Sequence, residues 1–323
     1  MPKAVVVSAL GGPEKLVYKD VPDRVPGPGE ARVRHTAIGL NFVDVYYRMG
    51  VYKAALPFVG GQEGAGVVEA VGPNVTEVAV GDRVGYAMVQ GAYADVRVIP
   101  AARLVRLPDD IDDRTAAAIM LKGMTAEYLL LRCGHVQRGE TVVFHAAAGG
   151  VGSLACQWAR ALGIRVIGTA GGPEKVRRAL ANGCDAVIDY TREDIVARVK
   201  ELTGGERVRV VFDSVGKATF AASLDCLRPR GLLALFGQSS GVVPPFDLSE
   251  LAAKGSLFVT RPSLGLSVAT RDELLQSASR LFDVVRSGAV KVEIGRTYPL
   301  AEVAAAHRDL EARKTVGSTL LSP

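Results

Sequence analysis

The residues in this sequence that are best suited to bind a reactive ligand are the glycines of a short loop near its middle. The segment 147–152 reads AAGGVG; it follows the apolar run 141–146 and precedes an alanine-rich stretch. In such an A-x-G-x-x-G pattern, Gly149 lets the backbone approach a pyrophosphate and Gly152 lets the helix pack closely on the strand. The N–H groups at the helix N-terminus then bind the phosphates. The segment therefore predicts a dinucleotide-binding loop, although the first glycine of the usual motif is alanine here.

The end of the next predicted strand distinguishes the two nicotinamide dinucleotides. Sites for NAD place an Asp or Glu at this position, on the ribose hydroxyls. Here the segment 168–175 reads GTAGGPEK, and the strand tip carries no carboxylate. A 2′-phosphate would not be repelled, and Lys175 could pair with it. The sequence therefore favours NADPH over NADH; the alternative is that Lys175 is an ordinary solvated helix lysine.

No local pattern for a metal site or a catalytic nucleophile accompanies this loop. The four cysteines form no CxxC pair, and the four histidines form no HExxH pattern. There is no G-x-S-x-G motif, and Ser214, at a predicted strand end, is better placed for a cofactor contact than for nucleophilic attack. His145 is expected to be hydrogen-bonded in the core. The chemistry is therefore expected to come from the cofactor.

Two patterns of secondary structure surround these residues. From residue 1 to about 110, short β-rich runs separated by Gly and Pro turns predict a β-barrel or sandwich. From residue 115 onward, strands alternate with amphipathic helices, which is typical of βαβ units and a parallel sheet. The expected strands of that sheet are 141–146, 165–169, 186–189, 208–213, 231–236 and 256–261. The two helices and two strands expected after residue 270 exceed what this sheet needs and are expected to return to the first domain.

Length and composition agree with two folded domains. The chain has 323 residues, more than one core usually organises, and it is 48% hydrophobic, which excludes a disordered protein. Its net charge of +5 permits nucleic acid, a membrane surface or a phosphorylated cofactor as partner without choosing among them. No segment approaches about 18 strongly apolar residues. We therefore expect no membrane association, reduced cysteines and a cytoplasmic location.

Taken together, the motifs resemble those of the zinc-independent quinone oxidoreductases, the zeta-crystallin-like branch of the medium-chain dehydrogenase/reductases. The matching segments follow the order of that family along almost the whole chain and are GQEGAG at 61–66, VGDRV at 80–84, LKGMTA at 121–126, HAAAGGVG at 145–152 and VTRP at 259–262. Gln62 stands where zinc-dependent relatives have the His of G-H-E, the Cys ligand expected near Asn41 is absent, and 86–106 contains no Cys. The resemblance therefore implies an enzyme without a metal.

The resemblance also implies an α/β fold class and a set of site residues. A GroES-like β-barrel catalytic domain would comprise 1–124 and 263–323, a Rossmann domain with a doubly wound parallel sheet would comprise 125–262, and the active site would lie in the cleft. Asn41, Tyr46 and Tyr52 would face the nicotinamide and the substrate. The cofactor would also contact Thr125, Ala148, Gly149, Gly150, Val151, Gly171, Lys175, Tyr190, Ser214, Phe236, Gly237, Gln238, Ser239 and Arg313. Of these, Gly171, Lys175, Tyr190 and Arg313 would surround the 2′-phosphate.

Several of these residues have simpler structural interpretations. Tyr46 could be an aromatic of the barrel surface, and Tyr52 could pack beside Pro57. Asn41 could satisfy the backbone of its own turn. Arg313 could occupy a helix C-terminus, where the helix dipole favours cations.

The reaction implied is the metal-free reduction of a quinone by NADPH, with Tyr46 or Tyr52 polarising the quinone oxygen. The nearest alternative is reduction of an activated C=C bond in an enal or enone. A different class of function is single-stranded RNA binding, which the resemblance makes possible. It is not expected, because basic and acidic residues interleave along 177–209 and no RNP-like motif occurs. The run Ser256–Thr260 is expected at a sheet edge, and the resemblance implies that it joins two subunits in a homodimer.

Overall fold

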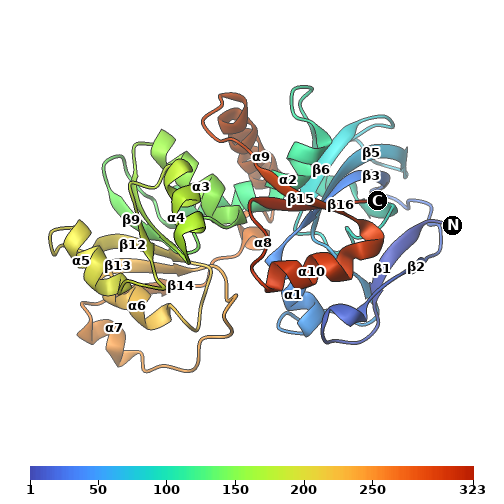
Figure 1. Ribbon diagram of the computed structural model, residues 1–323. Helices are drawn as coiled ribbons and strands as arrows, with labels where there is room; N and C mark the ends of the chain where they lie inside the picture. Colours follow the sequence, from blue (N-terminus) through green and yellow to red (C-terminus); the bar gives the residue numbers. More distant parts are fainter. The chain divides into compact units, whose positions relative to one another are not determined.

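The computed structural model describes residues 1–323, and the chain forms two compact units (Figure 1). Unit 1 comprises Met1–Met124, Val268–Arg286 and Val292–Pro323. Unit 2 comprises Thr125–Ser267 and Ser287–Lys291. The sequence placed the second boundary after residue 262, whereas the division in the structure falls after Ser267. No helix is both long enough and apolar enough to cross a bilayer.

Unit 2 is built on a six-stranded sheet with the order β11-β10-β9-β12-β13-β14. Its strands are β9 (Thr141–Phe144), β10 (Arg165–Ala170), β11 (Ala186–Asp189), β12 (Val208–Asp213), β13 (Leu227–Leu235) and β14 (Phe258–Thr260). Every neighbouring pair is parallel. The strand order reverses between β9 and β12, and sheets of this type bind ligands beyond the carboxyl ends of the strands at such a point.

Helices connect these strands, as the alternating pattern of the sequence predicts. They are α3 (Gly150–Ala161), α4 (Pro173–Ala181), α5 (Ile195–Leu202), α6 (Phe220–Asp225) and α7 (Ser249–Ala253), and α8 (Leu264–Ser267) follows the last strand. Val142, Val143, Val210 and Val211 are fully buried on adjacent strands. Such continuous β-branched runs are typical of a parallel sheet whose two faces are both covered.

The C-terminal segment completes the sheet of unit 1. This sheet has the order β15-β16-β3-β5-β6-β8, with β7 also paired to β3, and a smaller sheet has the order β2-β1-β4. The strands are β1 (Lys3–Val7), β2 (Leu16–Asp20), β3 (Glu30–Leu40), β4 (Phe58–Val59), β5 (Glu63–Val71), β6 (Arg83–Ala87), β7 (Val96–Pro100), β8 (Val105–Arg106), β15 (Ile294–Pro299) and β16 (Ser318–Ser322). β16 pairs antiparallel with the end of β3.

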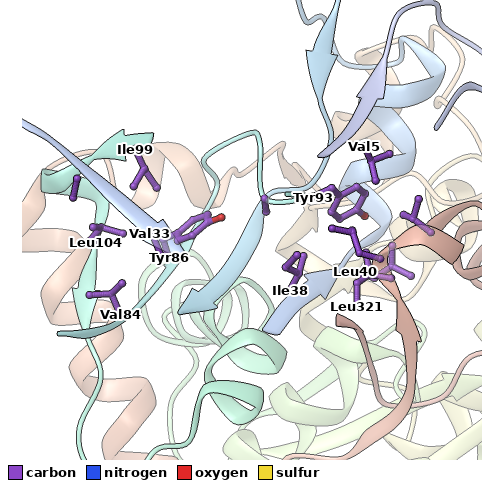
Figure 2. Close-up of a cluster of buried hydrophobic side chains, with 14 of the residues drawn as sticks. Val5, Val33, Ile38, Leu40, Val84, Tyr86, Tyr93, Ile99, Leu104 and Leu321 are labelled. Carbon is purple, nitrogen blue, oxygen red and sulfur yellow. The ribbon is translucent and has the colours of Figure 1, made fainter. Parts of the chain in front are cut away.

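The helices of unit 1 are α1 (Phe42–Met49), α2 (Asp113–Glu127), α9 (Arg271–Arg286) and α10 (Val303–Glu311), and the division between the units falls within α2. A π-helical turn, Tyr128–Cys133, follows α2. Figure 2 shows the core of unit 1, in which side chains from β1, β3, β6 and β16 meet, among them Val5, Ile38, Tyr86 and Leu321. Tyr86 and Tyr93, which are labelled in this view, are wholly buried, and their hydroxyls need partners inside the protein.

The main differences from the predicted elements lie at helix and strand ends. The strand predicted for 141–146 ends at Phe144, and Ala146 has a left-handed backbone with φ of 53°, which begins the glycine loop. Helix α5 begins at Ile195, because the Asp194 carboxylate accepts a 2.7 Å hydrogen bond from the N–H of Ala197 as an N-cap. These ends depend on individual hydrogen bonds, which apolar periodicity does not record.

Candidate functional site

The glycine loop lies at the point where the strand order reverses. Gly149 is the N-cap of α3, and Gly150 and Val151 form its first turn. A Cβ on Gly152 would lie 2.4 Å from the carbonyl oxygen of Ala146 and 2.8 Å from the Cα of Ala147. The helix therefore approaches the loop more closely than any residue with a side chain allows, which confirms the packing predicted for Gly152.

The start of α3 is suited to an anion. The first N–H groups of a helix have no partner within it, and the helix dipole adds a partial positive charge. The first turn of α3 contains no acidic residue, and Gly149, Gly150 and Val151 retain solvent exposure. Ala148 is nearly buried beside them. The loop thus has the geometry of a phosphate site.

A buried network of polar side chains lies next to the glycine loop and includes His145, the residue just after β9. The His145 side chain is fully buried, with its Nδ1 3.0 Å from Thr169 Oγ1 and its Nε2 3.0 Å from Ser223 Oγ. Burial lowers the pKa of His145, which keeps the ring neutral. Ser223 in turn donates a 2.7 Å hydrogen bond to Asp213 Oδ2. The prediction of a hydrogen-bonded core histidine is confirmed.

Asp213, which the sequence analysis missed, shapes the neighbouring loop. Its Oδ1 accepts hydrogen bonds from the N–H groups of Val215 and Gly216, and its Oδ2 accepts one from Thr219 Oγ1. These bonds fold the chain just after β12, where Ser214 lies. The sequence feature that could have identified Asp213 is its position as the last residue of β12, next to the point where the strand order reverses.

Ser214 and the segment 236–239 come together at the carboxyl ends of β12 and β13. The N–H of Ser239 donates to the carbonyl of Ser214, and a Cβ on Gly237 would lie 2.5 Å from that carbonyl oxygen. The Phe236 ring lies 5.8 Å from that of Phe144, at the end of β9. The segment predicted to line the cofactor channel, Phe236, Gly237, Gln238 and Ser239, thus begins beside the end of β9, the strand that leads into the glycine loop.

Two residues predicted at the 2′-phosphate meet beyond β10 and β11. A Cβ on Gly171 would lie 2.5 Å from the Tyr190 hydroxyl, so that hydroxyl occupies the space of a side chain. Tyr190 keeps 43% of its surface exposed. Lys175 lies in the first turn of α4, which begins just after Gly172, and is partly exposed. Gly172 has a φ of +86°, which favours glycine at this sharp turn.

Asp189 is a carboxylate near this turn that the sequence analysis did not consider. It lies opposite Ala170 in the parallel register of β10 and β11. Its Oδ1 accepts hydrogen bonds from the N–H of Gly172 at 3.0 Å, from the Thr191 hydroxyl at 2.7 Å and from the N–H of Thr191. These bonds, that of Gly172 foremost, lower the pKa of Asp189. This carboxylate is therefore occupied by the turn itself.

In unit 1, Asn41 is held by a buried carboxylate. It is the N-cap of α1, and its Nδ2 donates a 2.8 Å hydrogen bond to Glu63 Oε2. Lys122 Nζ lies 3.3 Å from the same oxygen, and the N–H of Leu121 donates to Glu63 Oε1 at 2.6 Å. Asn41 is 4% exposed and Glu63 is fully buried. The side chain of Asn41 also belongs to the capping box of α1, as the simpler interpretation expects, and the bond to Glu63 adds a second, long-range partner.

Tyr46 and Tyr52 lie together next to Asn41 in the chain. Their ring centroids are 5.2 Å apart in an edge-to-face arrangement, and the Phe42 ring lies 5.4 Å from that of Tyr46. The N–H of Tyr52 donates to the carbonyl of Tyr46. Tyr46 is only 8% exposed, so its interpretation as a surface aromatic is wrong. One helix and its following loop thus position Asn41, Tyr46 and Tyr52.

The other predicted residues have less distinctive surroundings. Thr125 is nearly buried in the last part of α2 and belongs to unit 2. Arg313 belongs to unit 1; it is exposed just beyond α10, with its N–H bonded to the carbonyl of Leu310. Its place at a helix end agrees with the simpler interpretation of this arginine.

The side chains present do not fit a zinc ion. In residues 1–323, no three or more His, Cys, Asp or Glu side chains gather as metal ligands. Gln62 is buried in place of the histidine ligand of zinc-dependent relatives. A structural or catalytic zinc normally needs three or four such ligands.

Comparisons with known proteins cover the whole chain. Residues 27–109 match the alcohol dehydrogenase GroES-like domain, and residues 150–279 match the zinc-binding dehydrogenase domain. A quinone oxidoreductase of Pseudomonas aeruginosa is 52% identical over 325 residues, with all of both chains covered. A 2-haloacrylate reductase of a Burkholderia species is 45% identical over 331 residues, covering 100% of this chain and 99% of the relative.

A solved structure agrees closely as well. The quinone oxidoreductase of Escherichia coli, complexed with NADPH, superposes with a TM-score of 0.98 at 46% identity and covers 99% of this chain and 100% of its own. The predicted α/β fold class, a GroES-like β-barrel domain with a Rossmann domain, is confirmed. On this full-length similarity, the chain belongs to the quinone oxidoreductase family of the medium-chain dehydrogenase/reductases.

Proposed function

We propose that this protein is an oxidoreductase that uses NADPH to reduce quinones. The observation that carries the proposal is the glycine loop at the start of α3, together with a cofactor-selecting turn that offers no free carboxylate. Asp189, the acid beside that turn, is engaged by Gly172 and Thr191. The names of the closely similar relatives and the NADPH in the similar solved structures support the same reaction.

The residues that would hold NADPH form two groups in unit 2. The pyrophosphate would lie on the N–H groups of the glycine loop and the first turn of α3. The adenosine 2′-phosphate would lie beside Gly171 and Tyr190, with the Lys175 ammonium as its charge partner. The remaining contacts proposed are Asn41, Thr125, Ala148, Gly149, Gly150, Val151, Ser214, Phe236, Gly237, Gln238, Ser239 and Arg313.

When bound, NADPH supplies the electrons that convert a quinone to a hydroquinone. Asn41, Tyr46 and Tyr52 then orient the substrate, and a tyrosine hydroxyl donates a hydrogen bond to the quinone oxygen that gains negative charge. Packing of the rings of Tyr46 and Tyr52 against each other restricts the rotamers that this role requires. A proton for the product is available from water.

The test is a comparison of acceptors with NADPH as the donor. Purified protein is assayed side by side with ortho- and para-quinones, alkenals and alkenones. We expect kcat/KM to be at least about tenfold higher for the best quinone than for any alkene. Turnover of alkenes with no quinone-dependent NADPH oxidation would contradict the proposal.

Reduction of an activated C=C bond is the second candidate. The observation in its favour is the 45% identity to a 2-haloacrylate reductase, whose named substrate carries such a bond. The cofactor site would be the same, and no metal would be needed. The acceptor panel above distinguishes the two candidates.

We further propose that the protein forms a homodimer through the run Ser256–Thr260. β14 is the last strand of the unit 2 sheet, and Phe258 on it is 60% exposed. An uncovered strand of this kind can pair with a second copy through its free backbone groups. Light scattering at micromolar concentration should give twice the chain mass, and a monomer would contradict the proposal. A cytoplasmic location stays a prediction, which the four free cysteines support.

A further inference from the structure

A chain of buried polar side chains inside unit 1 starts at Arg48 on α1, passes through His307 on α10 and Tyr93, and returns to α1 at Asp44. Arg48 Nη1 lies 3.0 Å from His307 Nδ1, and His307 Nε2 lies 3.1 Å from the Tyr93 hydroxyl. Tyr93 donates a 2.7 Å hydrogen bond to Asp44 Oδ2. All four residues are at least nine-tenths buried. The function proposed above does not use this chain of hydrogen bonds.

The chemistry of the end members fixes the direction of every bond. An arginine can only donate, so His307 Nδ1 must accept and carries no proton. Burial, followed by the charge of Arg48, lowers the pKa of His307 to about 3, so the ring is neutral. Its single proton is then on Nε2 and is donated to the Tyr93 oxygen. Tyr93 consequently directs its own proton to Asp44.

The first member of the chain is held firmly. Arg48 is 1% exposed and forms a two-pronged ion pair with Glu311, at 2.8 and 2.9 Å. Its Nε donates to the carbonyl of Gly11 at 3.0 Å. Fork-shaped pairs of this kind fix the guanidinium orientation as well as balancing its charge. Arg48 therefore cannot turn to offer His307 a different arrangement.

The last member of the chain, Asp44, has an uneven environment. Its Oδ2 accepts from Tyr93 and also from the N–H of Asn41 at 2.9 Å. Its Oδ1 is buried and has no hydrogen-bond partner. Burial raises the pKa of Asp44 to about 7, with the hydrogen bond from Tyr93 as the largest opposing effect. Asp44 therefore changes charge near neutral pH.

Several charged and titratable groups face Asp44. They are Tyr93, together with Arg48 and Tyr47 on α1, Glu63 on β5, Tyr86 on β6, Lys122 on α2 and His307 on α10. Glu63 and Lys122 form their own pair at 3.3 Å and act on Asp44 in opposite directions. His307 stays neutral, and Arg48 is balanced by Glu311. The variant Asp44→Asn therefore separates the response of Asp44 from that of these neighbours.

We propose that Asp44 is a positioning residue for Asn41 and that the directed chain Arg48–His307–Tyr93 holds it in that role. Hydrogen bonds to a carboxylate are stronger than those to a neutral acid. Ionised Asp44 thus accepts a strong hydrogen bond from the N–H of Asn41 and stabilises the first turn of α1, the helix that also contains Tyr46. Protonated Asp44 loosens this turn. The inference rests on the proposed function, because it takes Asn41 to contact the ligand.

The test measures KM and kcat for quinone reduction between pH 6 and pH 8. For the unmodified protein, the KM of the quinone should fall about threefold or more as the pH rises, with a smaller change in kcat. For Asp44→Asn, which cannot ionise, KM should be independent of pH and near the unmodified value at pH 6. A merely structural role would lower the melting temperature of this variant without changing the pH profile.

Two further variants keep the test decisive. Tyr93→Phe removes one hydrogen bond to Asp44, so the inflection in the plot of KM against pH should move to higher pH. This variant also provides the test if Asp44→Asn does not fold. Asp309→Asn is the control, because this α10 carboxylate accepts from the Tyr298 hydroxyl and lies outside the chain. Its pH profile should match that of the unmodified protein. An unshifted inflection in Tyr93→Phe, or a retained pH dependence in Asp44→Asn, overturns the proposal.

An infrared difference spectrum separates this inference from the proposed function. The C=O band of a protonated carboxylic acid should appear at pH 6, weaken by pH 8 and be missing in Asp44→Asn. If the protein reduces no quinone, the proposed function fails, and the dissociation constant of NADPH replaces KM as the readout of Asn41. Absence of this band from the unmodified protein at pH 6 contradicts the inference even if quinones are reduced.

Discussion

The side-chain amide of Asn41 donates a 2.8 Å hydrogen bond to Oε2 of the fully buried Glu63. The same oxygen lies 3.3 Å from Lys122 Nζ, which balances the buried charge. A carboxylate on β5 and a cation on α2 thus fix the Asn41 side chain at the start of α1. This arrangement would orient Asn41 for the ligand contact proposed for it.

Replacing Glu63 with Gln should therefore affect both stability and activity. The variant leaves Lys122 buried without a counter-charge, which should lower the free energy of unfolding by about 3 kcal/mol. Asn41 loses its charged acceptor, and kcat/KM for the quinone should fall about tenfold. Urea unfolding and steady-state kinetics measure the two effects. Glu69→Gln is the matched control, because Glu69 pairs with Arg32 and Arg34 at the partly exposed surface and should cost less than about 1 kcal/mol.

A methyl group at Gly152 should disrupt cofactor binding. The Cβ of Gly152→Ala would lie 2.4 Å from a backbone oxygen, so the loop itself must move. We expect the dissociation constant of NADPH, followed by fluorescence, to rise at least about tenfold, equivalent to 1.4 kcal/mol. In the control Gly27→Ala, the nearest atom is a side-chain oxygen of Glu30 at 3.3 Å, which can move aside. Equal affinities for all three proteins would argue against a phosphate site at this loop.

Removal of the Lys175 charge should reduce the preference for NADPH. If this ammonium pairs with the 2′-phosphate, Lys175→Ala should raise the KM of NADPH about tenfold or more and leave that of NADH unchanged. Arg177→Ala removes an exposed cation from the same helix and serves as the control. Parallel changes for the two cofactors would show that Lys175 only stabilises the helix.

Acid should destabilise the protein through His35. This residue is buried, with its Nδ1 2.6 Å from the carbonyl of Ala94 and its Nε2 2.7 Å from the Tyr86 hydroxyl. Burial lowers the pKa of His35 from 6.5 to about 4, so the unfolded chain binds a proton that the folded chain refuses. The neutral form of His35 therefore contributes to the free energy of unfolding above pH 6.5. This contribution, about 3 kcal/mol, is lost as the pH falls toward 4.

Unfolding experiments at several pH values check this prediction. The free energy of unfolding of His35→Gln should depend less steeply on pH between about 4 and 6.5 than that of the unmodified protein. Any constant loss of stability from the substitution does not affect this slope. Identical slopes for the two proteins would mean that the pKa of His35 is the same in the folded and the unfolded chain, which would contradict the prediction.

The sequence was informative where function depends on local backbone geometry. The glycine loop before α3 needs residues without side chains, and Gly152 shows this need directly. The alternation of strands and helices also predicted the parallel sheet of unit 2, because the apolar pattern of each element is visible in its own sequence. The family resemblance, and no local pattern, predicted Asn41, Tyr46 and Tyr52 as site residues.

The supporting residues could not be found in this way. Asn41 depends on Glu63, 22 positions away, and Asp44 depends on His307 through Tyr93, which lies 214 positions from that histidine. Asp189 accepts a hydrogen bond from the turn that follows the preceding strand. Such partners are set by how strands pair and helices pack, and one sequence without relatives does not record those pairings.

The most direct test of the account is the ratio of kcat/KM for NADPH to that for NADH, with a para-quinone as acceptor. A site that binds a 2′-phosphate through Lys175 and presents no free carboxylate predicts a ratio of at least about ten. The oxidation of NADPH should stop when the quinone is omitted. Equal efficiency with NADH, or oxidation of NADPH that does not depend on the quinone, would contradict the central claim.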